Sequence, residues 1–422
     1  MIAALTWCAI LWRLSLLPFP GSNVRRPITD NAVPSSQPAD ALRRRVLYVI
    51  NTLSRGGAEH GLATLIENGL FRETDLTVFV FARGDGGLRQ RMVELVGENR
   101  LVEANKDDRL TMSGMLRGAL MLARLIRRFR PDAVVLSLKQ ANIVGRSVLF
   151  FERGTTCVAF EHMARLEREP AAWLYEAILR LLSIRVDHVW ADCPTTLEKS
   201  RRYYPWRRRR AEAVVPLFIA GPETRKRSYR IVGPIRLVMA GRLIKRKRFD
   251  VAVDALAHLK ARGVEARCTV FGVGPEAGSI LARARAANVA DRLTLAGFAE
   301  NWWRLAAEHD IFVQASEEEG LCLVAAEAMM VGLPTITTVV GGLNDYSLDG
   351  ENAVHVPIGD ATALANAIAR LAGDEPRRRR LGMAAAQTIA ELYSPEAAWR
   401  RYGEAAGAFT ARDPDPSRLS PA

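Results

Sequence analysis

Two glutamates flank the start of a predicted helix in the second half of the chain. Glu319 lies in the loop that follows an apolar strand, and Glu327 follows eight positions later on the helix. Carboxylates accept hydrogen bonds from neighbouring hydroxyls, and a helix start attracts phosphate through its unpaired N–H groups. The segment therefore predicts a site for a polyhydroxylated ligand that carries phosphate. A solvated acidic loop over 317–319 is the alternative interpretation.

Two cationic side chains follow the first predicted strand of the same half. Gly241 and Arg242 end this strand, and Lys247 follows five residues after the arginine. Arginine binds phosphate oxygens in a bidentate manner, and lysine adds a point charge. Together they could neutralise a diphosphate leaving group as its charge develops. The alternative is a basic loop that interacts only with solvent.

Glycine-rich turns follow two further strands, one in each half of the chain. Gly272 and Gly274 form a Gly-x-Gly-Pro turn, and Gly56 and Gly57 open a predicted helix. Glycine lets the backbone approach an anion or a sugar closely, although Gly-x-Gly-Pro alone is usually only a turn. The first-half loop is not a G-x-G-x-x-G motif, which disfavours a nicotinamide site. His162 also follows a predicted strand, and a structural role is its alternative.

All of these residues follow short apolar strands that alternate with helical patterns. We predict strands over 46–50, 76–82, 133–138, 156–161, 188–192, 235–241, 266–272, 292–297, 310–316, 334–340 and 353–357, and helices over 361–373, 375–391 and 395–411. Continuous apolar strands separated by helices indicate parallel sheets covered on both faces. The fold class is therefore α/β, with two doubly wound, Rossmann-like domains facing each other across a cleft. Such sheets bind ligands beyond the carboxyl ends of their strands.

Length and composition set the expected domains. The 422 residues, 49% hydrophobic and 25% charged, suit a globular chain with two large domains. We expect a disordered or apolar leader over 1–45, an N-terminal Rossmann-like domain over 46–216, a linker over 217–233, a C-terminal Rossmann-like domain over 234–394, a helix over 395–411 packing back on the N-terminal domain, and a disordered tail over 412–422. The leader's apolar run is too short to span a bilayer and lacks signal-peptide features. Five scattered cysteines exclude a disulfide scaffold and suggest a reducing compartment.

The positive charge lies in the first half of the chain. Residues 1–230 carry 37 Lys and Arg against 23 Asp and Glu, whereas the rest carries 22 against 23. Basic and aromatic residues alternate over 201–210, and a second basic cluster comprises Arg124, Arg127, Arg128 and Arg130. This pattern favours peripheral contact with anionic lipid, with a solvated basic surface as the alternative. Nucleic acid is a further candidate partner, but the sequence contains no recognisable nucleic-acid module.

Taken together, these residues resemble the retaining glycosyltransferases of the GT-B group called family 4. The resemblance covers about 46–405 and is more specific in the second half. Its motifs are Gly56-Gly57-Ala58-Glu59, Gly241-Arg242-Leu243 with Lys247, Gly272-x-Gly-Pro-Glu276, Glu319-x7-Glu327, Gly341-Gly342 with Asp345, Gly350-Glu-Asn352 and Pro357-x-Gly-Asp360. Four positions depart from the family pattern: Arg248 and Cys322 replace the usual Gly, Val273 replaces a frequent Asp, and Leu321 replaces Phe.

The resemblance implies transfer of a hexose from a UDP- or GDP-linked sugar to an acceptor hydroxyl, with retention and without a metal or other cofactor. Arg242 and Lys247 would hold the diphosphate, Glu327 the ribose hydroxyls and Glu319 a hydroxyl of the donor sugar. The remaining donor-binding positions would be Gly241, Gly272, Gly274, Gly320, Leu321, Cys322 and Leu323, with Gly56 and Gly57 approaching from the first domain. His162 would lie near the transferred sugar.

The basic first half suggests an acceptor at a membrane. We expect a lipid-linked saccharide in cell-envelope or exopolysaccharide synthesis, used by a cytoplasmic protein at the inner face of the membrane. A sugar-nucleotide epimerase on the same fold is the first alternative, and a nucleic-acid-binding protein is the second. The glutamate pair and the Gly56-Gly57-Ala58-Glu59 loop favour the transferase.

Overall fold

A computed structural model describes most of the chain between residues 43 and 410. The described ranges are 43–54, 56–84, 87–106, 111–152, 154–162, 172–205, 211–221 and 225–410. Residues 1–42 of the expected leader, the basic run 206–210 and the expected tail 412–422 lie outside them. The chain divides into two compact units. Unit 1 contains residues up to Asp192, Leu197–Leu217 and the segment from Trp399 onward, and unit 2 contains Cys193–Thr196 and Phe218–Ala398.

Unit 1 is built on a parallel sheet whose strand order is β3-β2-β1-β4-β5-β6-β7. Its strands are β1 (Arg44–Ile50), β2 (Thr74–Val80), β3 (Leu101–Glu103), β4 (Ala133–Ser137), β5 (Thr156–Glu161), β6 (His188–Ala191) and β7 (Ala211–Val214). Its helices are α2 (Gly57–Glu67), α3 (Arg89–Val96), α4 (Met112–Phe129), α5 (Lys139–Val148), α6 (Ala172–Leu182) and α7 (Pro194–Ser200), the last of which begins in unit 2. The central strand β1 pairs with β2 and β4, and its apolar residues 46–50 are fully buried. Burial on both faces explains why these strands are apolar without alternation.

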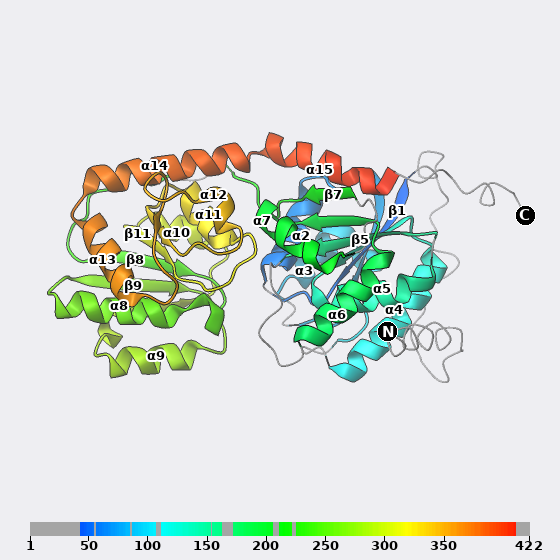
Figure 1. The fold of residues 1–422 in the computed structure, drawn as a ribbon, viewed down its shortest axis with the longest axis horizontal. Helices are drawn as coiled ribbons and strands as arrows, with labels where there is room; N and C mark the ends of the chain where they lie inside the picture. Colours follow the sequence, from blue (N-terminus) through cyan, green and yellow to red (C-terminus); the bar gives the residue numbers. More distant parts are fainter. Residues whose placement is uncertain are drawn as a thin grey trace, which may run out of the picture. The chain divides into compact units, whose positions relative to one another are not determined.

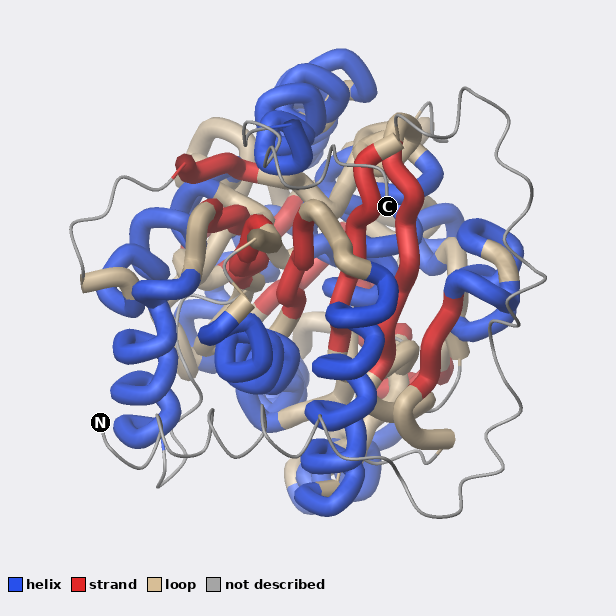
Figure 2. The backbone as a smooth tube through the Cα atoms, turned by 90° about the vertical axis from the view of Figure 1, so that its right-hand side faces the viewer, coloured by secondary structure: helices blue, strands red, loops and turns tan. Residues whose placement is uncertain are grey.

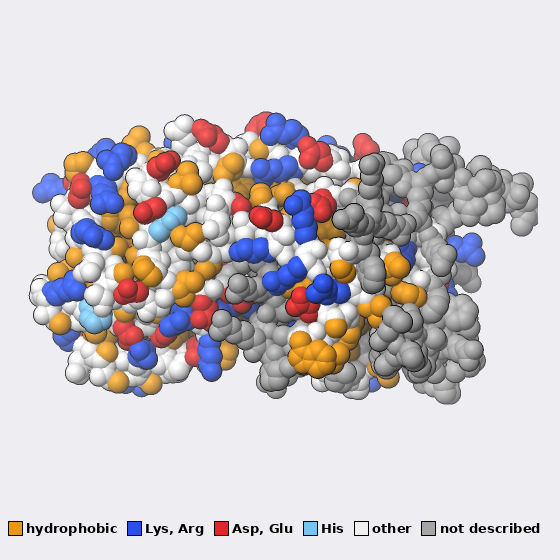
Figure 3. All heavy atoms as spheres, in the orientation of Figure 1, with side chains coloured by type: hydrophobic (Ala, Val, Ile, Leu, Met, Phe, Trp, Pro, Cys, Tyr) orange, Lys and Arg blue, Asp and Glu red, His pale blue; other side chains and the backbone are white. Residues whose placement is uncertain are grey.

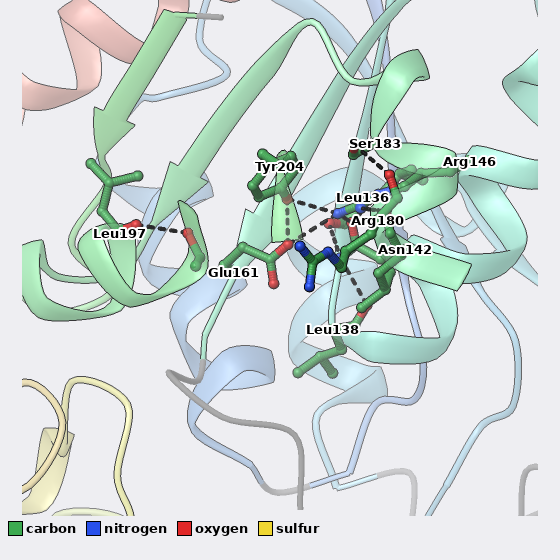
Figure 4. A network of polar contacts seen from close by, with 11 residues as sticks. Leu136, Leu138, Asn142, Arg146, Glu161, Arg180, Ser183, Leu197 and Tyr204 are labelled. Carbon is green, nitrogen blue, oxygen red and sulfur yellow. Dashed lines mark hydrogen bonds and ion pairs between the residues drawn. The ribbon is translucent and has the colours of Figure 1, made fainter. Parts of the chain in front are cut away.

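A buried polar cluster fixes the carboxyl end of β5 in unit 1 (Figure 4). The Arg146 side chain of α5 is fully buried, and it donates to Asn142 Oδ1 at 2.7 Å and to Glu161 Oε1 at 3.0 Å. The Tyr204 hydroxyl accepts from Arg146 at 2.8 Å and donates to Glu161 Oε1 at 2.5 Å. The buried guanidinium is therefore paired and hydrogen-bonded, as a buried charge must be. Its partner Glu161 is the residue just before His162.

Replacement of Tyr204 by phenylalanine is expected to reduce the free energy of unfolding by about 1–3 kcal/mol, because it leaves polar groups of a buried network without a partner. Tyr203→Phe is the matched control, since among the described residues the Tyr203 hydroxyl accepts only from the exposed Arg202. Urea unfolding of both variants measures the difference. Equal losses in the two variants would show that the Arg146 cluster contributes no more than a surface contact.

Unit 2 is built on a second parallel sheet, with strand order β10-β9-β8-β11-β12-β13. Its strands are β8 (Ile235–Ala240), β9 (Ala266–Phe271), β10 (Leu293–Gly297), β11 (Ile311–Gln314), β12 (Thr335–Thr337) and β13 (Val354–His355). Its helices are α8 (Phe249–Ala261), α9 (Ala277–Ala286), α10 (Trp302–Ala306), α11 (Leu323–Met330), α12 (Leu343–Tyr346), α13 (Ala361–Ala372) and α14 (Glu375–Leu392), and α15 (Pro395–Thr410) follows. The order is doubly wound: the chain moves outward from β8 to β10 and then returns to β11 on the other side.

Helices cover both faces of the unit 2 sheet. Leu237 and Met239 of β8 join a core with α8, α9 and α13, whereas Val238 and Ala240 join a core with α10, α11 and α14. This alternation follows from the two-residue repeat of a strand. Figure 1 shows α8 and α9 on one side of the strands and α10, α11 and α14 on the other. The same layering, strands between helices, is visible in the tube view (Figure 2). Two Rossmann-like units are therefore present, as predicted.

Two segments that connect the units, the expected linker and α15, belong partly to one unit and partly to the other. The segment expected as a linker over 217–233 packs within unit 2 from Phe218 onward, where Phe218 contacts the Tyr393 ring and the Tyr229 hydroxyl donates to Gly332 O at 2.9 Å. In α15, residues from Trp399 onward belong to unit 1. Phe409 stacks on Phe71 at 5.7 Å, which places the end of this helix on the unit 1 core. The buried aromatic residues Phe218 and Tyr229 attach the otherwise largely exposed linker segment to unit 2.

None of the helices in the described part of the chain has both the length and the apolar character of a membrane span.

Candidate functional site

The loops that follow β8 and β9 in unit 2 pack directly on each other. Gly241 and Gly272 have φ angles of 133° and 146°, which side-chain-bearing residues rarely adopt. A Cβ on Gly272 would lie 2.0 Å from Gly241 O, and one on Gly274 would lie 2.4 Å from Leu243 O. These glycines therefore allow two loops to contact each other. The sequence analysis had instead explained them by the close approach of a ligand to the backbone.

Arg242 lies just after the carboxyl end of β8. Its side chain is exposed, and it makes no hydrogen bond or ion pair with the residues that the structure describes. The neighbouring strand in the sheet is β11, whose carboxyl end leads into the Glu319 loop. An arginine at this edge without a partner among the described residues is available for an anionic ligand.

Lys247 and Glu319 form a buried ion pair. The Lys247 Nζ atom lies 2.7 Å from Glu319 Oε1, and the exposed fractions of the two side chains are 13% and 8%. Burial lowers the pKa of Lys247, but the charge of Glu319 outweighs it, so that the pKa lies above its usual value. Lys247 also lies over Gly241, with Nζ 3.6 Å from the position that a Cβ would occupy there. One ammonium group has three donors, so Lys247 can hold Glu319 and a phosphate oxygen together.

Two polar residues that sequence reasoning missed complete the surroundings of Glu319. Gln314 Nε2 and Ser316 Oγ donate to Glu319 Oε1 at 2.8 Å and 2.6 Å, and both side chains are buried. The sequence could have identified them, because they are polar residues at the end of an otherwise apolar strand. The carboxylate therefore has a fixed orientation before any ligand binds.

The turn that leads into α11 packs against a second pair of glycines, Gly341 and Gly342. Gly342 N donates to Gly320 O at 2.6 Å, and a Cβ on Gly341 would lie 2.1 Å from Glu319 O. The buried Tyr346 hydroxyl donates to Leu321 O and Cys322 O, another contact that the sequence did not predict. Cys322 has a φ of 63°, which explains why glycine is usual at this position.

The start of α11 combines backbone N–H groups with one half-buried carboxylate. No side chain caps the start of the helix at Leu323, and the first N–H groups of a helix have no partner inside it. Glu327 lies one turn further on, where its Oε2 accepts from Trp302 Nε1 at 2.7 Å. Burial raises the pKa of Glu327 to about 7, although the hydrogen bond from Trp302 opposes this rise. Trp302, like Gln314, Ser316 and Tyr346, is a residue that sequence reasoning missed.

Arg248 also occupies a position that favours glycine. Its φ of 51° places it in the left-handed region at the start of α8, while its guanidinium pairs with Asp250 at 3.0 Å and Glu317 at 3.4 Å. A cavity of about 400 Å³ lies beside it, between the starts of α8 and α9. This cavity is separate from the candidate site, because its lining does not include Arg242, Lys247, Glu319 or Glu327.

The unit 1 candidates lie at the carboxyl ends of β1 and β5. Gly56 has extended backbone angles and precedes α2, and Gly57 is exposed in the first turn of that helix. His162 is only 8% exposed, and its Nε2 lies 2.8 Å from Ser137 Oγ. Burial lowers the pKa of His162 to about 3, so the ring is neutral near pH 7. It can exchange a hydrogen bond with a hydroxyl, but it cannot supply a positive charge.

Within each unit, then, the predicted residues gather at one edge of a sheet. Arg242, Lys247 and Glu319 follow the adjacent strands β8 and β11, and Glu327 lies on the helix after β11. His162, Gly56 and Gly57 belong to unit 1. In the described ranges, no group of three or more His, Cys, Asp or Glu side chains has an arrangement that could hold a metal ion.

Comparison with known proteins identifies the relatives of both units. The family model for glycosyl transferases group 1 matches residues 222–388, and the model for the glycosyl transferase 4-like domain matches residues 56–217. The N-acetyl-alpha-D-glucosaminyl L-malate synthase of Bacillus anthracis is 32% identical over 36% of this chain and 40% of its own length. The lipopolysaccharide core biosynthesis glycosyltransferase LpsE of Rhizobium meliloti is 32% identical over 37% of this chain and 45% of its own length. The chain thus aligns with less than half of each of these two relatives.

Solved structures share the fold over a greater length. The structure of Anabaena Alr3699/HepE in complex with UDP and glucose has a TM-score of 0.69 and 16% identity, and the match covers 88% of this chain and 100% of that one. The two family models together span most of the described chain, one on each unit. The chain belongs to the family 4 glycosyltransferases and has the GT-B fold of two Rossmann-like domains.

Proposed function

We propose that the protein transfers a hexose from a UDP- or GDP-linked sugar to an acceptor hydroxyl, with retention of the anomeric configuration. Unit 2 binds the donor in this proposal, and unit 1 provides the acceptor side. The observation that carries it is the set of groups at one sheet edge of unit 2: Arg242, the Lys247–Glu319 pair and the start of α11. Among the described residues, no side chain binds Arg242 or caps this helix. A structural neighbour whose complex contains UDP and glucose supports this donor class.

Each group has a chemical task in the proposed reaction. The acceptor oxygen bonds to the anomeric carbon while the bond from that carbon to the diphosphate breaks, and the acceptor's proton passes to a diphosphate oxygen on the same face. Arg242, Lys247 and the amides of Leu321, Cys322 and Leu323 would stabilise the charge that develops on the diphosphate, in place of a metal ion. Glu319 would orient the donor sugar, and Glu327 the ribose. Gly241, Gly272, Gly274 and Gly320 shape the loops that carry these groups, while His162, Gly56 and Gly57 would act from unit 1.

A donor screen with the purified protein tests this function. It measures UDP or GDP released from a panel of sugar nucleotides, with lipid extract as the acceptor. Release that depends on the extract supports a transferase. Interconversion of sugar nucleotides without any acceptor would instead favour the epimerase, which remains the second candidate on this fold.

The proposed acceptor is a lipid-linked saccharide of the cell envelope or an exopolysaccharide. Relatives named for lipopolysaccharide core and colanic acid biosynthesis support it. On the face drawn in Figure 3, hydrophobic side chains gather where Figure 1 labels α6, and Trp173, Leu174 and Ile184 of this part of the chain are exposed. Exposed tryptophan beside basic residues suits the interface of an anionic membrane. Co-sedimentation with vesicles tests this contact, and equal binding to neutral and anionic vesicles would remove it.

Affinity for UDP-glucose is expected to fall about tenfold between pH 8 and pH 6, because only the ionised Glu327 carboxylate accepts hydrogen bonds from both ribose hydroxyls and its pKa is about 7. His162, with a pKa of about 3, stays neutral over this range. Calorimetric titration at several pH values measures the effect. Glu327→Gln is the control, and its affinity should not change with pH; a pH-dependent slope that survives in this variant would assign the titration to another group.

A further inference from the structure

Trp302 makes a direct hydrogen bond to the carboxylate of Glu327. It begins α10, is 5% exposed, and packs its ring against Phe312 at 5.7 Å and Phe271 at 6.1 Å. Its Nε1 atom donates to Glu327 Oε2 at 2.7 Å. Within the described residues, the Glu327 side chain makes no other hydrogen bond. One carboxylate oxygen is therefore occupied, and the other remains for a partner outside the chain.

The two groups suit each other chemically. An indole N–H is a donor only, and a hydrogen bond to a charged acceptor is shorter and stronger than one between neutral groups. The surrounding rings hold Trp302 in place, so the direction of the N–H is fixed by packing rather than by the carboxylate. Burial opposes ionisation of Glu327, and the N–H is the side-chain group that favours it. The N–H therefore favours the ionised carboxylate, whose free oxygen can accept a hydrogen bond from a hydroxyl.

We propose that Trp302 is a positioning residue for nucleotide binding: its indole N–H fixes Glu327 Oε2 so that the other carboxylate oxygen meets the ribose hydroxyls. This inference rests on the proposed function, in which Glu327 binds the ribose. Trp302 itself does not contact the ligand in this proposal. It therefore affects only those ligands that carry the hydroxyls, which separates its role from a general effect on the fold.

The chain provides a matched control in the next residue. Trp303 belongs to the same helix, and its buried Nε1 atom makes no hydrogen bond to the described residues. Trp303→Phe removes an indole N–H without removing a hydrogen bond, whereas Trp302→Phe removes the bond to Glu327 and keeps an aromatic ring. Any difference between the two variants reports the hydrogen bond rather than the loss of an indole.

The test is calorimetric titration at pH 8 with UDP, GDP and their 2′,3′-dideoxy analogues. For the nucleotide that the unmodified protein binds, Trp302→Phe is expected to weaken affinity about tenfold, the equivalent of one hydrogen bond to a charged group. Affinity for the corresponding dideoxy analogue should stay within about twofold of the unmodified protein's. Trp303→Phe should bind both nucleotides normally. In a Glu327→Gln background, Trp302→Phe should weaken UDP or GDP binding no further.

Two outcomes would overturn the inference. One is normal binding of both nucleotides by Trp302→Phe, and the other is an equal loss for the parent nucleotide and its dideoxy analogue. If Trp302→Phe does not fold, the tryptophan analogue benzothienylalanine at position 302 replaces the ring N–H by sulfur and keeps the ring shape, and the same comparison applies. Absence of any nucleotide binding by the unmodified protein would instead refute the proposed function, so the two failures are distinct.

Discussion

Replacement of Arg242 by alanine is expected to lower kcat by about 10²- to 10³-fold, the usual effect of removing one preorganised group that stabilises transition-state charge. Stability should not change, because the side chain is exposed and has no partner among the described residues. Initial rates with the donor found in the screen, together with a thermal unfolding curve, measure both quantities. Arg242→Lys should recover part of the rate, since lysine keeps the charge but not the bidentate geometry.

Arg267 provides the matched control for this variant. It is also an exposed arginine of unit 2, but it lies near the amino end of β9, away from the loops that carry the site. Arg267→Ala should keep the full rate. Near-normal turnover of Arg242→Ala would show that this guanidinium has no role in the proposed mechanism. The main argument for a diphosphate at the end of β8 would then be lost.

Replacement of Lys247 by methionine is expected to have two large effects. It leaves the buried Glu319 carboxylate without its cation, which costs about 3–5 kcal/mol of unfolding free energy for a buried pair. It also removes the ammonium group that is proposed to hold a phosphate oxygen, so donor affinity should be lost. Urea unfolding and calorimetric titration with UDP measure the two effects separately.

The double variant Lys247→Met/Glu319→Gln separates structure from binding. It removes both charges, and Gln314 and Ser316 remain as hydrogen-bond partners for the new amide. Stability should return to within about 1 kcal/mol of the unmodified protein, because neutral replacements of a buried pair are often well tolerated. UDP binding should remain lost. Recovery of binding in the double variant would mean that Lys247 serves only to neutralise Glu319.

Much of the fold could be predicted from the sequence because the buried strands are short, continuous apolar runs. β5 runs over the predicted 156–161, and β8, β9 and β10 differ from prediction by one residue at an end. The short strands β3 and β7 were missed, since three or four residues carry little periodic signal. The supposed linker looked free because of its glycine, proline and charged residues. Its attachment to unit 2 depends on Phe218 and Tyr229, whose partners are more than 100 residues away.

The sequence yielded candidate residues for the site but not the contacts between them. Sequence spacing predicted Arg242 and Glu319 in the loops after two strands and Glu327 on the following helix. It could not show that Lys247 and Glu319, 72 positions apart, bind each other. It also gave no means to pair Trp302 with Glu327. The departures at Arg248 and Cys322 acquire a physical meaning only with the φ angles, because both residues occupy left-handed positions where glycine is unstrained.

The division of α15 at Trp399 has a consequence for biosynthesis. Phe409 covers Phe71 and Trp190 in unit 1, yet the ribosome makes it only after the whole of Phe218–Ala398 has been translated. At usual elongation rates this delay is roughly 10 to 40 s. The nascent first unit must therefore wait with an aromatic surface uncovered, while the second unit can fold as soon as its own segment emerges. Chaperone dependence of newly made protein should accordingly be concentrated in the half that is synthesised first.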